Sequence, residues 1–124
     1  MSTHATLGVK LPDGRISGCY VHMDGDTMTP RIVDYVKRYS TTGLVVLIHR
    51  AQAAGGIRSF NVPKWAPRGP LSERPNEGVT ELMDNDDYII DEINFYEDHM
   101  GSFAWYLVDY DTGSVEEKWR QWQP

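Results

Sequence analysis

The sequence predicts an α+β fold in which two or three helices pack on an antiparallel sheet. Two hairpin patterns, at residues 5–22 and 102–122, stand near the two ends of the 124-residue chain, and segments with helical periodicity lie between them. Hairpins that flank helices are typical of domains in which helices cover one antiparallel sheet built from those hairpins. The length is that of one ordinary domain, so we expect a single domain over residues 1–124.

The first hairpin is the clearest local pattern in the chain. Residues 5–11 and 16–22 both alternate in the manner of strands. The intervening Pro12-Asp13-Gly14-Arg15 has turn chemistry, because proline fixes φ and glycine takes positive φ without strain. Asp24-Gly25 then ends the second strand. We therefore expect an antiparallel pair closed by this turn.

Two helices are expected next. Thr29-Pro30 marks a helix start, with the threonine as N-cap and the proline in the first turn. Apolar residues then recur at helical spacing as far as Ser40. A second helix is expected over residues 44–54, where an alanine-rich end and Gly55-Gly56 supply a stop. The apolar run at residues 44–48 leaves a buried strand as the alternative.

The second half of the chain is less regular. Residues 57–78 hold four of the seven prolines, which predicts a long loop instead of a central strand. Residues 85–98 suit an acidic helix, with a strand as the alternative. Residues 102–109 predict a strand that sets Phe103, Trp105 and Leu107 on one face against Ala104, Tyr106 and Val108 on the other. A turn after it leads into a last strand over residues 115–122.

Composition excludes several classes of protein. Hydrophobic residues make up 40% of the chain, and no run approaches the roughly 20 apolar residues that a membrane-spanning helix needs. The first residues have neither the basic segment nor the apolar core of a secretory signal. Cys19 is the only cysteine, which excludes an intrachain disulfide and predicts a buried, inert thiol. We expect a cytoplasmic protein without membrane contact.

Charge is distributed unevenly along the chain. Residues 1–70 carry nine Lys/Arg and four Asp/Glu, residues 71–124 carry three and fourteen, and the net charge is −6. This asymmetry gives the molecule a positive and a negative face, unless the two segments interleave in the fold. The eight carboxylates between Glu81 and Asp98 form either a solvated surface or an imitation of a phosphate backbone.

Motifs for catalysis and metal binding are weak. His22, Asp24 and Asp26 have a spacing that suits a divalent cation, but turn formation at Asp24-Gly25 explains the same residues. The chain contains no G-x-S-x-G, P-loop or G-x-G-x-x-G motif. We therefore expect no enzyme, no metal site and no cofactor, with a small hydrolase as the least favoured alternative.

The predicted loop over residues 57–78 combines cations with an aromatic side chain. Arg58, Lys64 and Arg68 flank Trp65 in the sequence. This mixture suits a phosphate together with a nucleobase, and packing of the tryptophan on the core is the alternative. An extended nucleic acid is not expected, because the net charge is negative and the basic residues are scattered. Tryptophans near the C-terminus favour contact between copies of the chain, so we expect a homo-oligomer.

A distinctive pattern runs through the N-terminal part of the sequence, and it consists of Ser2-Thr3-x-Ala5-Thr6-Leu7-Gly8, Asp13-Gly14 and Cys19-Tyr20-Val21-His22-Met23-Asp24-Gly25, followed by an amphipathic helix ending in Tyr39-Ser40. This pattern resembles that of a group of small bacteriophage-encoded proteins. The resemblance covers about the first 50 residues and extends to the strand at 106–108, which is similar to their C-terminal hairpin. Asp26 and Met28 depart from the group, whose members often have an aromatic residue and a histidine there.

This resemblance implies a phage source and, for a small acidic protein without catalytic motifs, a counter-defence role in the host cytoplasm. We expect a protein that sequesters a small nucleotide immune signal, and an acidic inhibitor that imitates DNA is the alternative. Arginines would hold phosphate, the tryptophan would stack on a base, and an aspartate would bind a ribose hydroxyl. The expected ligand contacts are His22, Asp24, Arg31, Trp65 and Arg68.

Overall fold

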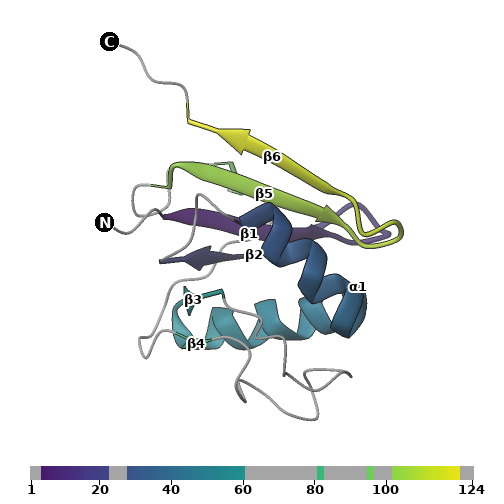
Figure 1. Ribbon diagram of the computed structural model, residues 1–124, viewed down its shortest axis with the longest axis horizontal. Coiled ribbons are helices and arrows are strands. Elements are labelled where there is room, and N and C mark those ends of the chain that lie inside the picture. Colours follow the sequence, from purple (N-terminus) through teal and green to yellow (C-terminus); the bar gives the residue numbers. More distant parts are fainter. Residues whose placement is uncertain (1–3, 23–27, 61–80, 83–94, 97–101, 121–124) are drawn as a thin grey trace.

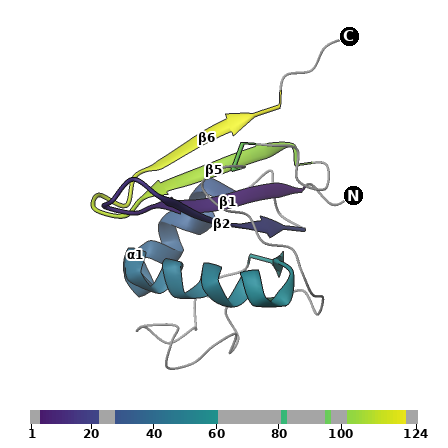
Figure 2. The ribbon, with the colours of Figure 1, turned by 180° about the vertical axis from the view of Figure 1, so that it is seen from behind.

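The protein folds as one mixed sheet with a long, bent helix on one face (Figures 1 and 2). The computed structural model describes residues 4–22, 28–60, 81–82, 95–96 and 102–120. The helix is α1 (Met28–Ala54), and the α+β class is confirmed. The strands, which lie in the spatial order β4-β3-β2-β1-β5-β6, are β1 (Ala5–Lys10), β2 (Ile16–Val21), β3 (Ile57–Ser59), β4 (Glu81–Leu82), β5 (Ala104–Asp109) and β6 (Val115–Trp119).

Both predicted hairpins are present, but they join side by side in parallel. β1 pairs antiparallel with β2, with Leu7 opposite Cys19, and β5 pairs antiparallel with β6, with Leu107 opposite Glu116. β1 and β5 run parallel, with Leu7 opposite Tyr106. The prediction of an antiparallel sheet is wrong at this join, because turn chemistry determines how consecutive strands pair but not how two distant hairpins meet.

A further strand comes from the segment predicted as a loop. β3 pairs parallel with β2 through Ile57 and Val21, and α1 forms the crossover between the two strands. The prediction of a loop beginning at residue 57 is wrong here, because the four prolines begin only at Pro63, after the strand has ended. Phe60 is fully buried. The rest of the predicted loop lies outside the described residues, as does the predicted element at 85–98 except for residues 95 and 96.

α1 contains both helices that the sequence predicts between the hairpins. Its backbone leaves helical geometry at Ser40 (φ 67, ψ 173), and the helix bends there into two arms (Figure 1). The second arm confirms the helix expected over residues 44–54, and Gly55 and Gly56 end it with positive φ. Neither this helix nor any other among the described residues is long and apolar enough to cross a membrane.

The first turn of α1 makes contacts that the sequence does not predict. The helix begins at Met28, one residue before the expected N-cap. The Thr29 hydroxyl lies inside the helix and donates to the Glu117 carboxylate of β6, so the predicted cap is wrong. Arg31 donates from Nη1 to the carbonyl oxygen of Phe60 at 3.0 Å, which ties the same helical turn to the end of β3.

The main hydrophobic core lies between α1 and the sheet. Alternate side chains of β1, β2 and β5 point toward the helix, and both arms of the helix contribute. Cys19 is buried in this layer, as predicted. Removal of this apolar surface from water is the main force that holds the helix on the sheet. The fully buried side chains include Leu7, Val9, Val21, Ile32, Tyr35, Leu44, Leu47, Ile48, Ile57 and Val108.

The opposite face of the sheet carries a smaller apolar cluster. Tyr20, Trp105, Leu107 and Phe95 pack together there, and each is at most 9% exposed. Gly8 of β1 lies beneath the phenylalanine ring. A Cβ atom at this glycine would be only 2.5 Å from Phe95 Cε2, so the absence of a side chain admits the ring. β1 is therefore buried on both faces.

Gly8→Ala is expected to lower the free energy of unfolding by about 1–3 kcal/mol, because the added methyl group overlaps a buried ring. Urea denaturation followed by circular dichroism measures the change. The control combines Gly8→Ala with Phe95→Leu, whose smaller side chain relieves the overlap. The two effects should then be less than additive, and simple addition would contradict the packing described.

Ser40→Gly is expected to stabilise the protein. The φ and ψ angles of Ser40 fall in a region that is essentially restricted to glycine, and a residue held there costs about 1–3 kcal/mol. This strain exceeds the entropic cost of a glycine, so the free energy of unfolding should rise by roughly 1 kcal/mol in calorimetry. Ser40→Ala is the control, because it keeps Cβ and removes only the hydroxyl that accepts from the Gly43 N–H at 3.4 Å. A Ser40→Gly variant no more stable than the wild type would show that the residue is not strained.

Candidate functional site

Two histidines meet where β1 begins and β2 ends. The hairpin register pairs Ala5 with Val21. His4, one residue before Ala5, therefore lies beside His22, one residue after Val21. Alternation along both strands directs the two imidazoles, together with Tyr20, to the face opposite α1. The imidazole rings are stacked, with centroids 4.9 Å apart and planes inclined by 27°, and both residues are half-buried.

Tyr20 orients the imidazole of His22. The tyrosine hydroxyl oxygen lies 2.8 Å from His22 Nδ1, and the tyrosine ring meets the His4 ring edge-on at 5.5 Å. Burial raises the pKa of Tyr20 to about 12, so the hydroxyl keeps its proton at neutral pH. When it donates to Nδ1 of the neutral imidazole, the ring proton of His22 is on Nε2. Protonation of His22 then requires the hydroxyl to change from donor to acceptor.

Arg58 adds a permanent positive charge at the same strand end. The backbone N–H of His22 donates to the carbonyl oxygen of Ile57 at 2.8 Å. This bond places Arg58, the next residue of β3, beside the histidine pair. Burial lowers the pKa of His22 below its ordinary value of 6.5, and the positive charges of His4 and Arg58 lower it further. We call His4, Tyr20, His22 and Arg58 the strand-end cluster.

The strand-end cluster can hold an anion. The positive charges of Arg58 and of the protonated histidines repel one another. A negative ligand would offset this repulsion and accept charge-assisted hydrogen bonds. Nearby nucleophiles are engaged elsewhere, since Cys19 is buried on the α1 face and the Thr6 and Ser102 hydroxyls bond each other at 2.9 Å. Within the described parts of the chain, no group of three or more His, Cys, Asp or Glu side chains could hold a metal ion.

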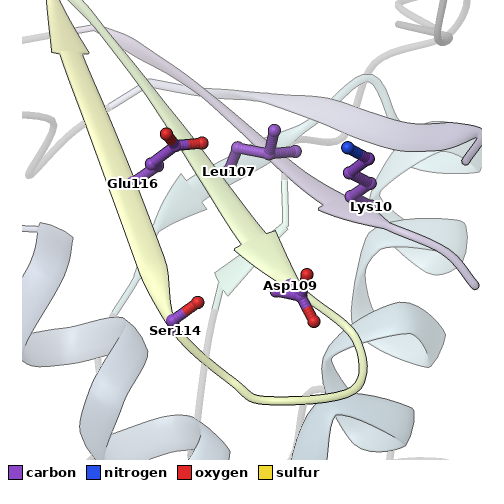
Figure 3. Close-up of a pocket in the computed structure, with 5 residues that line it drawn as sticks. All are labelled: Lys10, Leu107, Asp109, Ser114 and Glu116. Atoms are coloured by element: carbon purple, nitrogen blue, oxygen red, sulfur yellow. The ribbon is translucent and has the colours of Figure 1, made fainter.

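A pocket of about 250 Å³ lies at the other end of β1, on the same face of the sheet. Figure 3 shows the side chains that line it: Lys10, Leu107, Asp109, Ser114 and Glu116. Asp109 is engaged in the β5–β6 turn, where Oδ1 accepts from the N–H groups of Asp111 and Thr112 at 2.9 and 3.0 Å. The bond from Thr112 is the main cause of the lowered pKa of Asp109. With two carboxylates and one ammonium group, this pocket is less suited to phosphate than the strand-end cluster.

The structure describes two of the five predicted ligand contacts and places them apart. His22 belongs to the strand-end cluster. Arg31 lies on α1, which covers the opposite face of the sheet, and donates to the carbonyl oxygen of Phe60. The other three contacts lie outside the described residues, and they are Asp24, Trp65 and Arg68.

The sequence contained a signal for the partners of His22. A turn over residues 12–15 places His4 beside the end of the second strand, and alternation puts Tyr20 and His22 on one face. Arg58 is harder to assign, because β3 is only three residues long and shows no detectable period. The cluster was therefore partly predictable from the hairpin alone.

The lowered pKa of His22 predicts a loss of stability in mild acid. Between the folded-state pKa and 6.5 the unfolded chain binds more protons at this residue, so the free energy of unfolding falls as the pH falls through that window. Denaturation at about pH 7.5 and about pH 5.5 should show a larger loss for the wild type than for His22→Gln.

His49→Gln is the matched control for this prediction, because His49 is exposed on α1, away from the strand-end cluster. This variant should keep the pH dependence of the wild type. An equal pH dependence in the wild type and in His22→Gln would contradict the electrostatic description of the cluster.

Comparison with known proteins assigns the chain to no family. No family model matches its sequence, no curated protein matches it, and no solved structure matches its fold. A function for this chain therefore has to be inferred from its own side chains, and the strand-end cluster is where those with ligand-binding chemistry converge.

Proposed function

We propose that the protein binds and sequesters a small phosphate-bearing ligand of the nucleotide class at the strand-end cluster. The observation that carries the proposal is the convergence of two imidazoles and one guanidinium at the place where β1 begins, β2 ends and β3 begins to pair with β2. Both charged groups that shift the pKa of His22 are positive, so an anion supplies complementary charge.

The chemistry of the cluster fits a phosphate group. A guanidinium such as that of Arg58 binds two phosphate oxygens through parallel N–H groups. His22 offers a further donor at Nε2 when Tyr20 occupies Nδ1. Hydrogen bonds to charged groups contribute about 1.5–3 kcal/mol each, and half-buried residues are screened less by solvent than exposed ones.

Sequestration is proposed in preference to cleavage. Hydrolysis of a phosphate ester needs a nucleophile or a positioned water beside a general base. Cys19 is fully buried on the other face, and burial raises the pKa of its thiol. The hydroxyls of Thr6 and Ser102 are bonded to each other. Because these nucleophiles are engaged, we assign His22 to binding. Release of a cleaved product, which would require a water activated by His22, is the outcome that would reassign it to catalysis.

The biological role proposed on the basis of the bacteriophage resemblance is counter-defence, in which a phage protein removes a nucleotide immune signal from the host cytoplasm. Asp24, Trp65 and Arg68 stay predicted contacts of that ligand. The acidic alternative, an inhibitor that imitates DNA, depends on residues 81–98, most of which lie outside the described part of the chain.

Calorimetric titration with a panel of linear and cyclic nucleotides tests the proposal. One ligand of the panel should bind with stoichiometry near one per chain and be recovered intact after heat denaturation of the protein. Arg58→Gln should weaken binding by about 10- to 100-fold, because the variant loses a hydrogen bond to a charged group.

Arg15→Gln is the matched control, since Arg15 is exposed in the β1–β2 turn, at the far end of the sheet, where it pairs with Asp13 at 2.7 Å. This variant should bind as the wild type does. Binding to none of the nucleotides, or equal losses in Arg15→Gln and Arg58→Gln, would contradict the proposed site.

A further inference from the structure

β6 forms an outer edge of the sheet. In the strand order of the described residues it pairs with β5 on one side and with no strand on the other, and both views show the outer side of β6 without a neighbouring helix or strand (Figures 1 and 2). Trp119 at its end is 43% exposed, although its ring also meets that of Tyr106 at 6.4 Å. A strand edge of this kind is a ready template for pairing with another strand.

The backbone register shows which groups face outward along this edge. The Arg120 N–H donates to the carbonyl oxygen of Phe103, and the Asp109 N–H donates to that of Ser114, so even-numbered residues of β6 hydrogen-bond to β5. Because N–H and C=O groups alternate in direction along a strand, the odd-numbered residues Val115, Glu117 and Trp119 direct theirs to the open side.

We propose that β6 pairs antiparallel with β6 of a second copy of this chain, with Glu117 opposite Glu117 at the two-fold axis. In this register the outward-facing residues meet one another as hydrogen-bonded pairs. Each Val115 lies opposite Trp119 of the second copy. The backbone hydrogen bonds between the two strands continue the sheet through both molecules. The binding partner of this edge is thus β6 of a second copy, which supplies a backbone donor and acceptor for every outward-facing residue.

The side chains favour this register over its neighbours. Glu116 lies opposite Lys118 of the second copy, twice by symmetry, and on the other face of the sheet each Val115 meets an exposed tryptophan. A register centred on Lys118 places two lysines opposite each other and separates valine from tryptophan. A register centred on Glu116 sets Trp119 opposite Gly113. The like charges at the Glu117 centre are the one unfavourable pair, and each of these carboxylates also accepts from the Thr29 hydroxyl.

This interface is independent of the proposed ligand site. β2 and β6 are separated by β1 and β5, so a strand spacing of about 4.8 Å sets the two strand-end clusters of the dimer roughly 34 Å apart. Each cluster lies within one subunit. Loss of the dimer should therefore leave nucleotide binding unchanged, and failure of one proposal does not entail failure of the other.

Cysteine cross-linking of the full chain tests the register. Residues opposite each other in a hydrogen-bonded antiparallel pair have Cα atoms about 5.5 Å apart, which suits a disulfide. Glu117→Cys should form a covalent dimer under mild oxidation, whereas Glu116→Cys and Lys118→Cys should form little, because neither residue faces itself. Cys19 is fully buried, so we do not expect it to form a disulfide between copies. The oxidised wild type, which contains only this cysteine, is the control.

Sedimentation equilibrium tests the surface without new cysteines. The wild type should dimerise, Glu116→Lys should weaken the dimer roughly tenfold, and Glu116→Lys with Lys118→Glu should restore it, because the swap re-forms both opposite-charge pairs. Circular dichroism of each variant confirms folding. A wild type that stays monomeric at several hundred micromolar, a dimer indifferent to Glu116→Lys, or cross-linking that is strongest at residue 116 or 118 would overturn the proposal.

Discussion

The pairing of β1 with its two neighbours is the constraint on which the rest of the structure depends. β1 hydrogen-bonds to β2 on one side and to β5 on the other, and both of its faces are buried, one by α1 and one by the apolar cluster around Phe95. A shift of one residue in its register would turn Leu7 and Val9 away from the helix and direct Lys10 toward the core. The register that protects the core also sets His4 beside His22, so the site takes its geometry from the same pairing that stabilises the fold.

Local chemistry accounts for the parts of the fold that could be predicted from the sequence. Alternation and a Pro-Asp-Gly turn specify the first hairpin, and the double glycine at residues 55–56 specifies where the second arm of α1 ends. The parallel join between β1 and β5 was not predictable in this way, because it pairs residues that are far apart in the chain and depends on how the intervening segment returns. β3 escaped detection because three residues are too few to show a period. Thr29 was predicted as the N-cap, but α1 begins at Met28, and the Thr29 hydroxyl bonds to Glu117 of β6, a tertiary contact that no local pattern reveals.

The candidate site shows the same division between local and distant information. His22 was identified from its position at a strand end, and the hairpin register extends that identification to His4 and Tyr20. Arg58 reaches the cluster only through the parallel pairing of β3 with β2, which no local pattern reveals. Arg31 was predicted as a ligand contact because it lies near the start of a basic helix. In the structure it donates a hydrogen bond to the carbonyl oxygen of Phe60. Charge along the sequence therefore did not indicate which cations would meet.

The most direct measurement of the central claim is an NMR titration of the His22 imidazole, with its resonance assigned by comparison with His22→Gln. We expect a pKa below 6.5 in the free protein, because burial and two neighbouring positive charges disfavour the imidazolium. With saturating nucleotide the pKa of His22 should rise, because a phosphate beside the ring stabilises the protonated form. A pKa of His22 that does not move while the nucleotide is bound would contradict binding at the strand-end cluster.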